Sequence, residues 1–303
     1  MSFVTRLTES NPSPATLSIE LPHGTVRVRI AGPEHSDAPP VLFLHPFLMD
    51  GSLWAGVAER LATQGIRSYA PDLPLGSHRE PVKEGTDQSP RGVARQVIRL
   101  MEALDLRDVT LVGGDTGGAL CQYLLDTDAS RIGRLVLTNS DAFEQFPPFP
   151  FNAMFSLLKG TARMKVNLQP MRWRAFRHSP LGLGLLAHDL DPVQTRAWIE
   201  PSLRSRAIRH DAVRFLKAAE GRDLVDVATR LDRFAGPVTI VWGAADRAFT
   251  PELGRRLQRA FRQARLIEVP RARTLVCLDA PDALVDAILR TMPVLDGRDP
   301  PSS

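Results

Sequence analysis

Residues 109–122 read VTLVGGDTGGALCQ, and this stretch decides the fold of the chain. A β-branched and aliphatic run, Val109–Gly113, leads into Gly-Asp-Thr-Gly, and helix-forming residues follow at once. This order predicts a strand that turns sharply into a helix. Glycines at 113 and 117 fit because such a turn brings neighbouring backbones too close for a β-carbon. We therefore expect Asp115 to project from the carboxyl edge of a sheet, beside a helix N-terminus.

A phosphate-binding loop is the main alternative for a glycine-rich turn between a strand and a helix. It fits the sequence badly, because no Lys-Ser/Thr pair follows the glycines. In addition, the carboxylate of Asp115 would repel a phosphate at the anion site. The turn is better interpreted as one that presents a nucleophile.

Short β-branched and aliphatic runs alternate with helical patterns along the rest of the chain. The predicted strands are Thr16–Glu20, Thr25–Ile30, Val41–Leu44, Ser68–Ala70, Val109–Gly113, Leu135–Thr138, Val238–Val241 and Leu266–Val269. The predicted helices are Leu53–Gln64, Pro90–Leu104, Gly118–Leu125, Pro251–Ala264 and Pro281–Thr291. Strands that alternate with helices favour an α/β fold, in which helices cover both faces of a parallel sheet.

The alternation breaks once, because residues 142–231 contain no convincing strand and carry helical periodicity. We interpret this segment as a helical lid over the carboxyl edge of the sheet, where ligands bind in open α/β folds. The predicted core then comprises residues 15–141 and 232–293, and we expect flexible termini at 1–14 and 294–303. A separate helical domain is the alternative for the inserted segment.

The composition is that of an ordinary folded protein. Of the 303 residues, 43% are hydrophobic and 24% are charged, which excludes a disordered or collagen-like chain. The first fifteen residues lack the pattern of a signal peptide, and no window approaches eighteen uninterrupted apolar residues. Only two cysteines occur, Cys121 and Cys277, without the spacing of metal ligands. We therefore expect free thiols and a cytoplasmic protein that has no membrane-spanning segment and does not bind a membrane.

The formal net charge of +4 does not indicate a nucleic-acid partner. The basic residues are almost all arginine, which we attribute to codon composition. Residues 143–230 hold 14 basic and 8 acidic side chains, and solvated helix faces account for this surplus. A weak preference of this segment for anionic ligands is the alternative.

Three further motifs join the turn at Asp115, and with them the chain resembles the α/β-hydrolase superfamily over residues 15–293. Leu44-His45-Pro46-Phe47 is similar to the family's oxyanion loop. Pro71–Ser77 is similar to its Asp-x-x-Gly-x-Gly turn, with serine in place of the last glycine. Val241–Pro251 resembles the loop that presents the acid of the catalytic triad, here Asp246. The resemblance implies an α/β-hydrolase fold, with an eight-stranded, mostly parallel sheet and a helical lid.

An aspartate at position 115 resembles the branch of haloalkane dehalogenases and epoxide hydrolases. In that branch the carboxylate attacks carbon, and water activated by a histidine then hydrolyses the resulting ester. The resemblance implies that the backbone N–H groups of Phe47 and Thr116 stabilise developing negative charge. Two features depart from the branch: Thr116 replaces the tryptophan that holds a halide, and the only tyrosines, Tyr69 and Tyr123, lie outside the lid.

The larger departure concerns the catalytic histidine. Residues 269–281 read VPRARTLVCLDAP, and aligning both flanking prolines places Thr274 where relatives carry histidine, beside the substrate. Threonine is not a base near neutral pH, so the triad is broken. His45, at the end of its strand, is one candidate for direct chemistry. The other histidines are expected at the surface, in structural roles or in the lid: His23, His35, His78, His178, His188 and His210.

Two acids are candidates to assist Asp115. Asp246 follows a late strand, and Asp141 follows the strand before the lid. Both also suit a structural role, in which the carboxylate caps the next turn. Carboxyl groups that crowd an apolar pocket raise one another's pKa, and a protonated carboxyl is a competent general acid.

The leading hypothesis is a hydrolase of a small, mainly apolar molecule, with Asp115 as nucleophile. A cofactor-free lyase, isomerase or cyclase that uses Asp115 as general acid or base is the second. A ligand-binding protein on a disabled hydrolase fold is the third. No motif indicates a cofactor or a metal, and the expected partner is a small-molecule substrate of a monomer or homodimer.

Overall fold

The structure is a computed structural model that describes residues 15–146, 151–219 and 221–293. The expected flexible termini, 1–14 and 294–303, lie outside the described residues.

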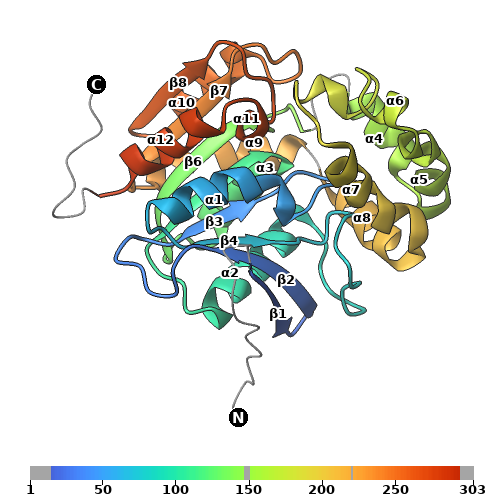
Figure 1. Ribbon diagram of the computed structural model, residues 1–303, viewed down its shortest axis with the longest axis horizontal. Coiled ribbons are helices and arrows are strands. Elements are labelled where there is room, and N and C mark those ends of the chain that lie inside the picture. Colours follow the sequence, from blue (N-terminus) through green and yellow to red (C-terminus); the bar gives the residue numbers. More distant parts are fainter. Residues whose placement is uncertain (1–14, 147–150, 220, 294–303) are drawn as a thin grey trace.

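One eight-stranded sheet forms the centre of the molecule, in the order β1-β2-β4-β3-β5-β6-β7-β8 (Figure 1). Its strands are β1 (Ala15–Leu21), β2 (Gly24–Ala31), β3 (Val41–Leu44), β4 (Ser68–Pro71), β5 (Val109–Asp115), β6 (Ile132–Ser140), β7 (Val238–Gly243) and β8 (Ala264–Val269). β2 pairs antiparallel with both β1 and β4, and every other neighbouring pair is parallel. The predicted α/β class and its mostly parallel eight-stranded sheet are confirmed, and each predicted strand forms.

The burial of the strands follows from their place in the sheet. All four residues of β3 are buried, because helices cover both faces of a central parallel strand. β2, near the edge, alternates instead between buried and partly exposed residues, with Val26 and Val28 facing the core.

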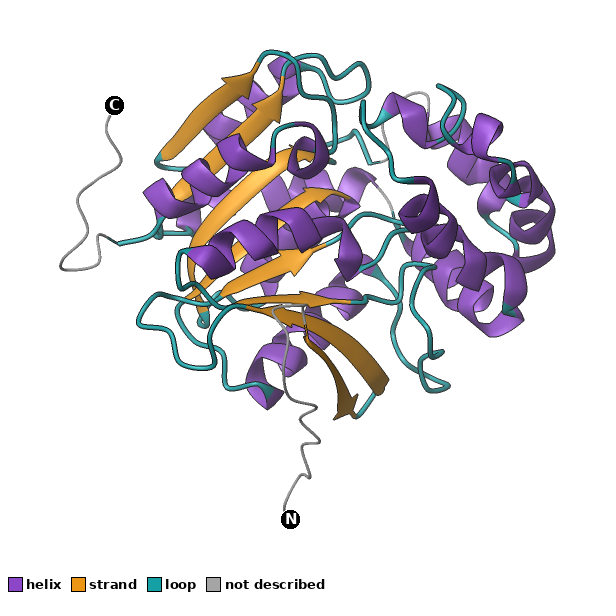
Figure 2. Ribbon diagram, viewed as in Figure 1, coloured by secondary structure: helices purple, strands orange, loops and turns teal. Residues whose placement is uncertain are grey.

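Helices cover the two faces of the sheet (Figure 2). α1 (Ala55–Thr63) packs beside α12 (Pro281–Thr291) on one face, and α2 (Pro90–Ala103) packs beside α3 (Thr116–Thr127) on the other. α10 (Pro251–Ala260) and α11 (Val276–Asp279) complete the core helices near β7.

Two predicted helix boundaries were wrong. The helix expected to run to Ala264 ends at Ala260, because Ala264 already pairs with Val238 as the first residue of β8. The helix expected from Leu53 begins as a 3-10 turn, Gly51–Trp54, which Asp50 caps through Ser52 N.

A helical segment lies between β6 and β7, and most of its helices gather at one end of the sheet (Figure 1). Its helices are α4 (Phe151–Leu158), α5 (Thr161–Asn167), α6 (Arg174–Arg177), α7 (Pro192–Arg204), α8 (Arg206–Ala218) and α9 (Gly221–Ala228), with 3-10 turns at Gln169–Arg172, Leu183–Leu185 and Leu231–Arg233. Within 142–231, the described residues include no strand. α9 packs against α3, so we call α4 to α8 the cap helices.

Among the helices of the described residues, none has the length and apolar character needed to cross a membrane.

Candidate active site

Asp115 is the last residue of β5 and the N-cap of α3, in the strained conformation that the sequence predicts for this turn. Its backbone has φ +51° and ψ −131°, which non-glycine residues rarely adopt. A β-carbon on Gly113 would lie 2.6 Å from Gly117 O, and one on Gly117 would lie 2.1 Å from Leu44 O. Both positions therefore need glycine, because the elbow packs directly against backbone of its own turn and of β3.

The carboxylate of Asp115 accepts two hydrogen bonds from the next residue. Its Oδ1 lies 2.5 Å from Thr116 N and 2.9 Å from Thr116 Oγ1. Thr116 thus lies beside the carboxylate, as expected, but its N–H group already donates to Asp115. It can bind a developing oxyanion only after the Asp115 side chain turns away.

Asp141 directly follows β6, the strand next to β5, and Asp115 pairs in register with Ser140. Asp141 is buried, with a side chain that opens onto the same cavity as Asp115. Gln122 Nε2 fixes its backbone through a 2.8 Å hydrogen bond to Asp141 O. Among the described residues, Asp141 Oδ1 has no hydrogen-bond partner, so it is available to a bound molecule.

A cavity of about 490 Å³ lies between the carboxyl edge of the sheet and the cap helices. Apolar side chains from both parts form most of its lining, including Phe47 and Phe249 from the core and Met171 and Leu186 from the cap segment. The polar side chains of the described lining come from Asp115, Asp141 and Asn167. The described lining contains no lysine, arginine or histidine. This cavity suits a small, mainly apolar molecule.

Phe47 contributes its ring to this cavity. The ring stacks on Phe215 with centroids 6.2 Å apart and lies 5.3 Å from Phe155. Phe47 therefore links the loop after β3 to the cap, in addition to the backbone role expected of it.

Burial gives the two cavity carboxyl groups unusual proton affinities. The pKa of Asp115 is raised to about 6, first by burial and then by the charge of Asp246, while the bonds from Thr116 oppose the shift. The pKa of Asp141 is raised well above its ordinary value, first by burial and then by the charge of Asp115. Near neutral pH, Asp115 is therefore ionised, and its charge makes ionisation of Asp141 less favourable.

Asp246 lies after β7 and is held by four hydrogen bonds outside the cavity lining. Its Oδ1 accepts from Ala248 N and Phe249 N at 2.8 Å and 3.1 Å. Its Oδ2 accepts from Thr274 Oγ1 at 2.7 Å and from Asn139 Nδ2 at 2.9 Å. Burial raises the pKa of Asp246, and these hydrogen bonds oppose the shift.

Asn139 holds the loop of Asp246 in position, and it was not among the residues predicted from the sequence. It is fully buried on β6, and besides Asp246 it bonds to both backbone groups of Gly243, with its Oδ1 2.6 Å from Gly243 N. Its side chain therefore ties β6 to the loop of Asp246. A buried asparagine in the Thr-Asn-Ser-Asp stretch was the available signal, since a buried amide needs partners.

The structure does not place His45 at the cavity, so the expectation of direct chemistry is corrected. Its ring is fully buried, with Nδ1 2.8 Å from Pro46 O and Nε2 accepting from Leu73 N at 2.7 Å. Burial lowers its pKa, so the ring is neutral. Both nitrogens serve backbone groups, and His45 joins the loops after β3 and β4.

The lid histidines also lie away from the cavity lining. His178 Nε2 bonds to Thr195 Oγ1 at 2.9 Å, and His188 Nε2 bonds to Arg271 O at 3.0 Å. His210 is exposed on α8. The described lining of the cavity contains no histidine. The titratable side chain that shares the cavity with Asp115 is that of Asp141, which follows the neighbouring strand.

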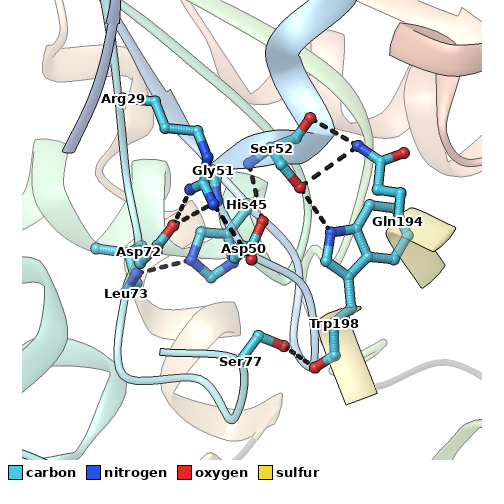
Figure 3. Close-up of polar contacts among 10 residues, drawn as sticks. All are labelled: Arg29, His45, Asp50, Gly51, Ser52, Asp72, Leu73, Ser77, Gln194 and Trp198. Atoms are coloured by element: carbon cyan, nitrogen blue, oxygen red, sulfur yellow. Dashed lines mark hydrogen bonds and ion pairs between the residues drawn. The ribbon is translucent and has the colours of Figure 1, made fainter. Parts of the chain in front are cut away.

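A polar network joins the loops behind the site to the cap (Figure 3). Asp72, from the predicted turn Pro71–Ser77, forms an ion pair with Arg29 and accepts from Gly51 N at 3.0 Å. Arg29 also lies 3.4 Å from Asp50. These contacts hold the turn that begins at Gly51 against β2 and the end of β4.

Ser52, in that turn, anchors cap helix α7 (Figure 3). Trp198 Nε1 donates to Ser52 Oγ at 3.0 Å, and Gln194 Nε2 donates to Ser52 O at 2.8 Å. On the other side, Ser77 Oγ donates to Trp198 O at 2.6 Å. One side of the cavity is therefore fixed to the core.

Within the described ranges, no group of three or more His, Cys, Asp or Glu side chains is arranged to hold a metal ion. Cys121 and Cys277 are both buried free thiols.

Comparisons with known proteins agree with the fold. A family model described as the alpha/beta hydrolase fold matches residues 39–281. An uncharacterized protein of Mycobacterium tuberculosis is 29% identical over 245 residues, covering 77% of this chain and 68% of that protein. A 2-hydroxy-6-oxononadienedioate/2-hydroxy-6-oxononatrienedioate hydrolase of Paraburkholderia xenovorans is 28% identical, covering 76% of this chain and 78% of the relative.

Solved structures show the same architecture. The haloalkane dehalogenase DbeA of Bradyrhizobium elkani superposes with a TM-score of 0.73 at 18% identity, covering 91% of this chain and 98% of that one. An alpha/beta hydrolase fold protein of Burkholderia ambifaria gives a TM-score of 0.74 at 23% identity, covering 91% and 99%. At these identities the similarity establishes the fold.

Proposed function

Because the chain belongs to the α/β-hydrolase fold family, we propose that it hydrolyses a small, mainly apolar substrate, with Asp115 as nucleophile and Asp141 as acid–base partner. One observation carries this proposal. Asp115 ends β5, Asp141 directly follows the neighbouring parallel strand β6, and both line the same apolar cavity. An epoxide suits this pair, because its ring opening needs a nucleophile and a proton donor at once.

The raised pKa values support the roles of nucleophile for Asp115 and proton donor for Asp141. Near neutral pH the Asp115 carboxylate is the nucleophile, since its pKa of about 6 leaves it ionised. We assign the proton donor to Asp141, because burial and the nearby charge of Asp115 raise its pKa and disfavour a second carboxylate. Two carboxyl groups in unlike environments divide the work of nucleophile and acid in this way.

In the first step, a carboxylate oxygen of Asp115 attacks a ring carbon of the epoxide. The carbon–oxygen bond of the ring breaks, its electron pair goes to the oxygen, and that oxygen takes the proton of Asp141. The products are an alkyl ester of Asp115 and a carboxylate at Asp141. Asp141 thus supplies the proton that lid tyrosines would otherwise give.

In the second step, the Asp141 carboxylate takes a proton from water, and the resulting hydroxide attacks the ester carbonyl carbon of Asp115. The bond between the carbonyl carbon and the alkoxy oxygen breaks, and this oxygen, which came from Asp115, takes the proton back from Asp141 and leaves in the diol, while the water oxygen stays in Asp115. Asp115 is left as a carboxylic acid and passes its proton to the Asp141 carboxylate. The sum is one water added to one epoxide, with both groups restored.

The similar proteins support hydrolysis as the reaction class. The lining of the cavity indicates a substrate of different charge from that of the relative. The Paraburkholderia xenovorans relative hydrolyses dioates, which carry two negative charges. The described lining of this cavity contains no cation to balance such charges, so we propose an uncharged substrate. Thr116, in the position of a halide-binding tryptophan, favours an epoxide over an alkyl halide.

A second function is favoured by the bond between Thr116 N and Asp115. Because that N–H group, the expected oxyanion donor, is engaged by the carboxylate itself, Asp115 is also placed to move a proton without forming an ester. Asp115 as base and Asp141 as acid would then catalyse an isomerisation, elimination or cyclisation.

The experiment is intact-mass spectrometry after incubation with a panel of small epoxides, alkyl halides and activated esters. We expect turnover of an epoxide by the native protein, an accumulating ester adduct in Asp141→Asn, and no adduct in Asp115→Asn. Asp189→Asn, which removes an exposed carboxylate outside the cavity lining, is the control and should behave as the native protein. Turnover by the native protein together with no adduct in Asp141→Asn contradicts the covalent route and supports the second function. Turnover that survives in Asp115→Asn contradicts both.

A further inference from the structure

A second hollow lies on the cap, on the far side of a wall from the cavity of Asp115. It has a volume of about 390 Å³ and lies between the 3-10 turn Gln169–Arg172 and helix α7. Met171 and Ile199 line both spaces, so they form the wall between them. We call this space the cap hollow.

Four cations and one carboxylate, Glu200, are in the described lining of the cap hollow, and three of the cations have no ion-pair partner among the described residues. Lys165, Arg172 and Arg196 line it, and among the described residues none of the three forms an ion pair. The fourth basic side chain, Arg204, is satisfied by Glu200 at 2.6 Å. Three unpaired like charges around one concave surface repel one another and attract an anion.

The sequence around the hollow strengthens this charge imbalance. Residues 145–188 contain six lysine and arginine residues and no aspartate or glutamate. The surplus noted in the sequence is therefore not spread evenly over solvated helix faces, because three of its cations meet in this hollow. A side chain of opposite sign is absent from this stretch of chain.

The same hollow exposes apolar surface. Trp173 lines it and is 67% exposed, whereas Trp54, Trp198 and Trp242 are almost fully buried. An exposed tryptophan beside arginine and lysine offers a flat apolar face next to positive charge. A partner that fills this space needs both an anionic group and an apolar or aromatic body.

We infer that the cap hollow is a binding site for a small amphipathic anion, a phosphate or carboxylate attached to an apolar body. The anionic group contacts Lys165, Arg172 and Arg196, and the apolar body packs on Trp173. This site is separate from the proposed reaction site, whose described lining contains no cation. The inference does not depend on the proposed reaction, and it modifies the expectation that basic residues of the cap are only solvated.

Octyl phosphate is a suitable probe, used below its micelle concentration, with 1-octanol and inorganic phosphate as its separate halves. Trp173 is the exposed one of four tryptophans, so acrylamide quenching of tryptophan fluorescence reports on this site. We expect octyl phosphate to protect the fluorescence saturably, and each half to bind at least about tenfold more weakly. Calorimetry gives the Kd independently of the fluorophore.

The variant Arg172→Gln/Arg196→Gln should weaken binding of octyl phosphate by at least about tenfold, because it removes two of the three charged donors to the anionic group. Arg163→Gln, which removes an exposed cation of α5 outside the hollow, should leave the Kd unchanged, as should Asp115→Asn. Binding that is equal in the double variant, or no saturable binding, overturns the inference.

Vesicles of phosphatidylglycerol distinguish the source of the anion. Cosedimentation that is lost in Arg172→Gln/Arg196→Gln assigns the site to a lipid headgroup. Binding of octyl phosphate without cosedimentation assigns it to a soluble anion. Cosedimentation that persists in the double variant, together with unchanged binding of octyl phosphate, places anion binding elsewhere on the cap and contradicts the site.

Discussion

The hydroxyl of Thr274 donates a 2.7 Å hydrogen bond to Oδ2 of Asp246. Both side chains are buried, and neither lines the cavity of Asp115. The threonine thus bonds to the residue that the resemblance implies is the acid of the triad. Asp246 is consequently held in place by four donors, whereas Asp141 faces the cavity with an unpartnered oxygen. This contrast is why we assign acid–base work to Asp141.

Replacing Thr274 by valine tests the bond to Asp246. Valine keeps the shape of threonine but leaves a buried carboxylate oxygen with one donor fewer, so we expect the free energy of unfolding to fall by about 1–3 kcal/mol. Thr274→Ser retains the hydroxyl and should lose less. Urea unfolding of the three proteins measures the difference. Equal stability of the valine variant and the native protein would show that the bond contributes nothing.

The fold could be predicted from sequence because its signals are local. Period-two and buried apolar runs identified all eight strands, and the two glycines at 113 and 117 identified the elbow. Helix ends were less accurate, since the end of α10 at Ala260 is set by pairing of β8 with β7 rather than by its own residues. The expectation that Thr274 lies near Asp246 came from the resemblance, by aligning the prolines that flank residue 274 with the family's histidine motif.

The division of roles among the acids could not be predicted, because it depends on contacts between distant segments. Asp246 and Asp141 both follow a strand, and only the donors from Asn139 and Thr274 distinguish them. His45 was a reasonable candidate until the structure showed both ring nitrogens bonded to backbone. The cap hollow likewise requires Arg172 and Arg196, far apart in sequence, to meet.

The pH dependence of turnover should follow the two cavity carboxyl groups. Asp115 must be ionised to attack, so kcat/KM should fall as pH drops through about 6. Asp141 must be protonated, so kcat/KM should fall again at higher pH, because its pKa is raised well above the ordinary value. We expect a bell-shaped plot of kcat/KM against pH, measured with the same substrate at every pH. A profile with no acidic limb near pH 6 contradicts Asp115 as the ionised group.

Asp115 should lower the stability of the fold at neutral pH, as a buried charge does. Its folded-state pKa of about 6 lies above the ordinary value of 3.8, so protonation favours the folded state. The stability from that proton is full below pH 3.8 and is lost as pH rises through about 6. Asp115→Asn keeps an acceptor for Thr116 and avoids the charge.

We therefore expect Asp115→Asn to be more stable than the native protein above about pH 7, by up to about 3 kcal/mol, which is the equivalent of the pKa shift. Below about pH 4 the two proteins should be equally stable. Chemical unfolding at both pH values measures this, with Asp189→Asn as the control. A variant that is less stable at neutral pH would show that the carboxylate is stabilised by its surroundings.

Ser52→Ala should loosen the anchor of α7. The change removes the acceptor of Trp198 Nε1, which is then buried without a partner, and leaves the backbone bond from Gln194. We expect a loss of about 1–3 kcal/mol in stability and faster proteolysis within the cap, with a raised KM. Ser36→Ala, which removes a hydroxyl bound to Gly65 O far from the cap, is the control. Cleavage at the same rate in both variants contradicts the anchor.

The threonine at position 274, where the resemblance implies a histidine, leads to the sharpest test of the covalent route. In Asp141→Asn the ester of Asp115 should form only slowly, because the proton donor is lost, and then persist, because no base activates water. Positioned general-base catalysis contributes about 10²–10⁴-fold, so the lifetime of the adduct should lengthen by that order. Adding Thr274→His to this variant places an imidazole beside Asp246, which can orient it.

We expect the double variant Asp141→Asn/Thr274→His to break down the adduct faster than Asp141→Asn alone and to regain multiple turnovers. Histidine is larger than threonine, and overpacking a buried position costs about 1–3 kcal/mol, so thermal unfolding must first show that the double variant is folded. Thr274→Gln in the same background is the matched control, because glutamine adds similar bulk without a base. Mass spectrometry of the adduct over time separates the outcomes. A folded double variant whose adduct lasts as long as that of the glutamine control would show that position 274 cannot serve the second step, and that Asp246 is not placed to support a base there.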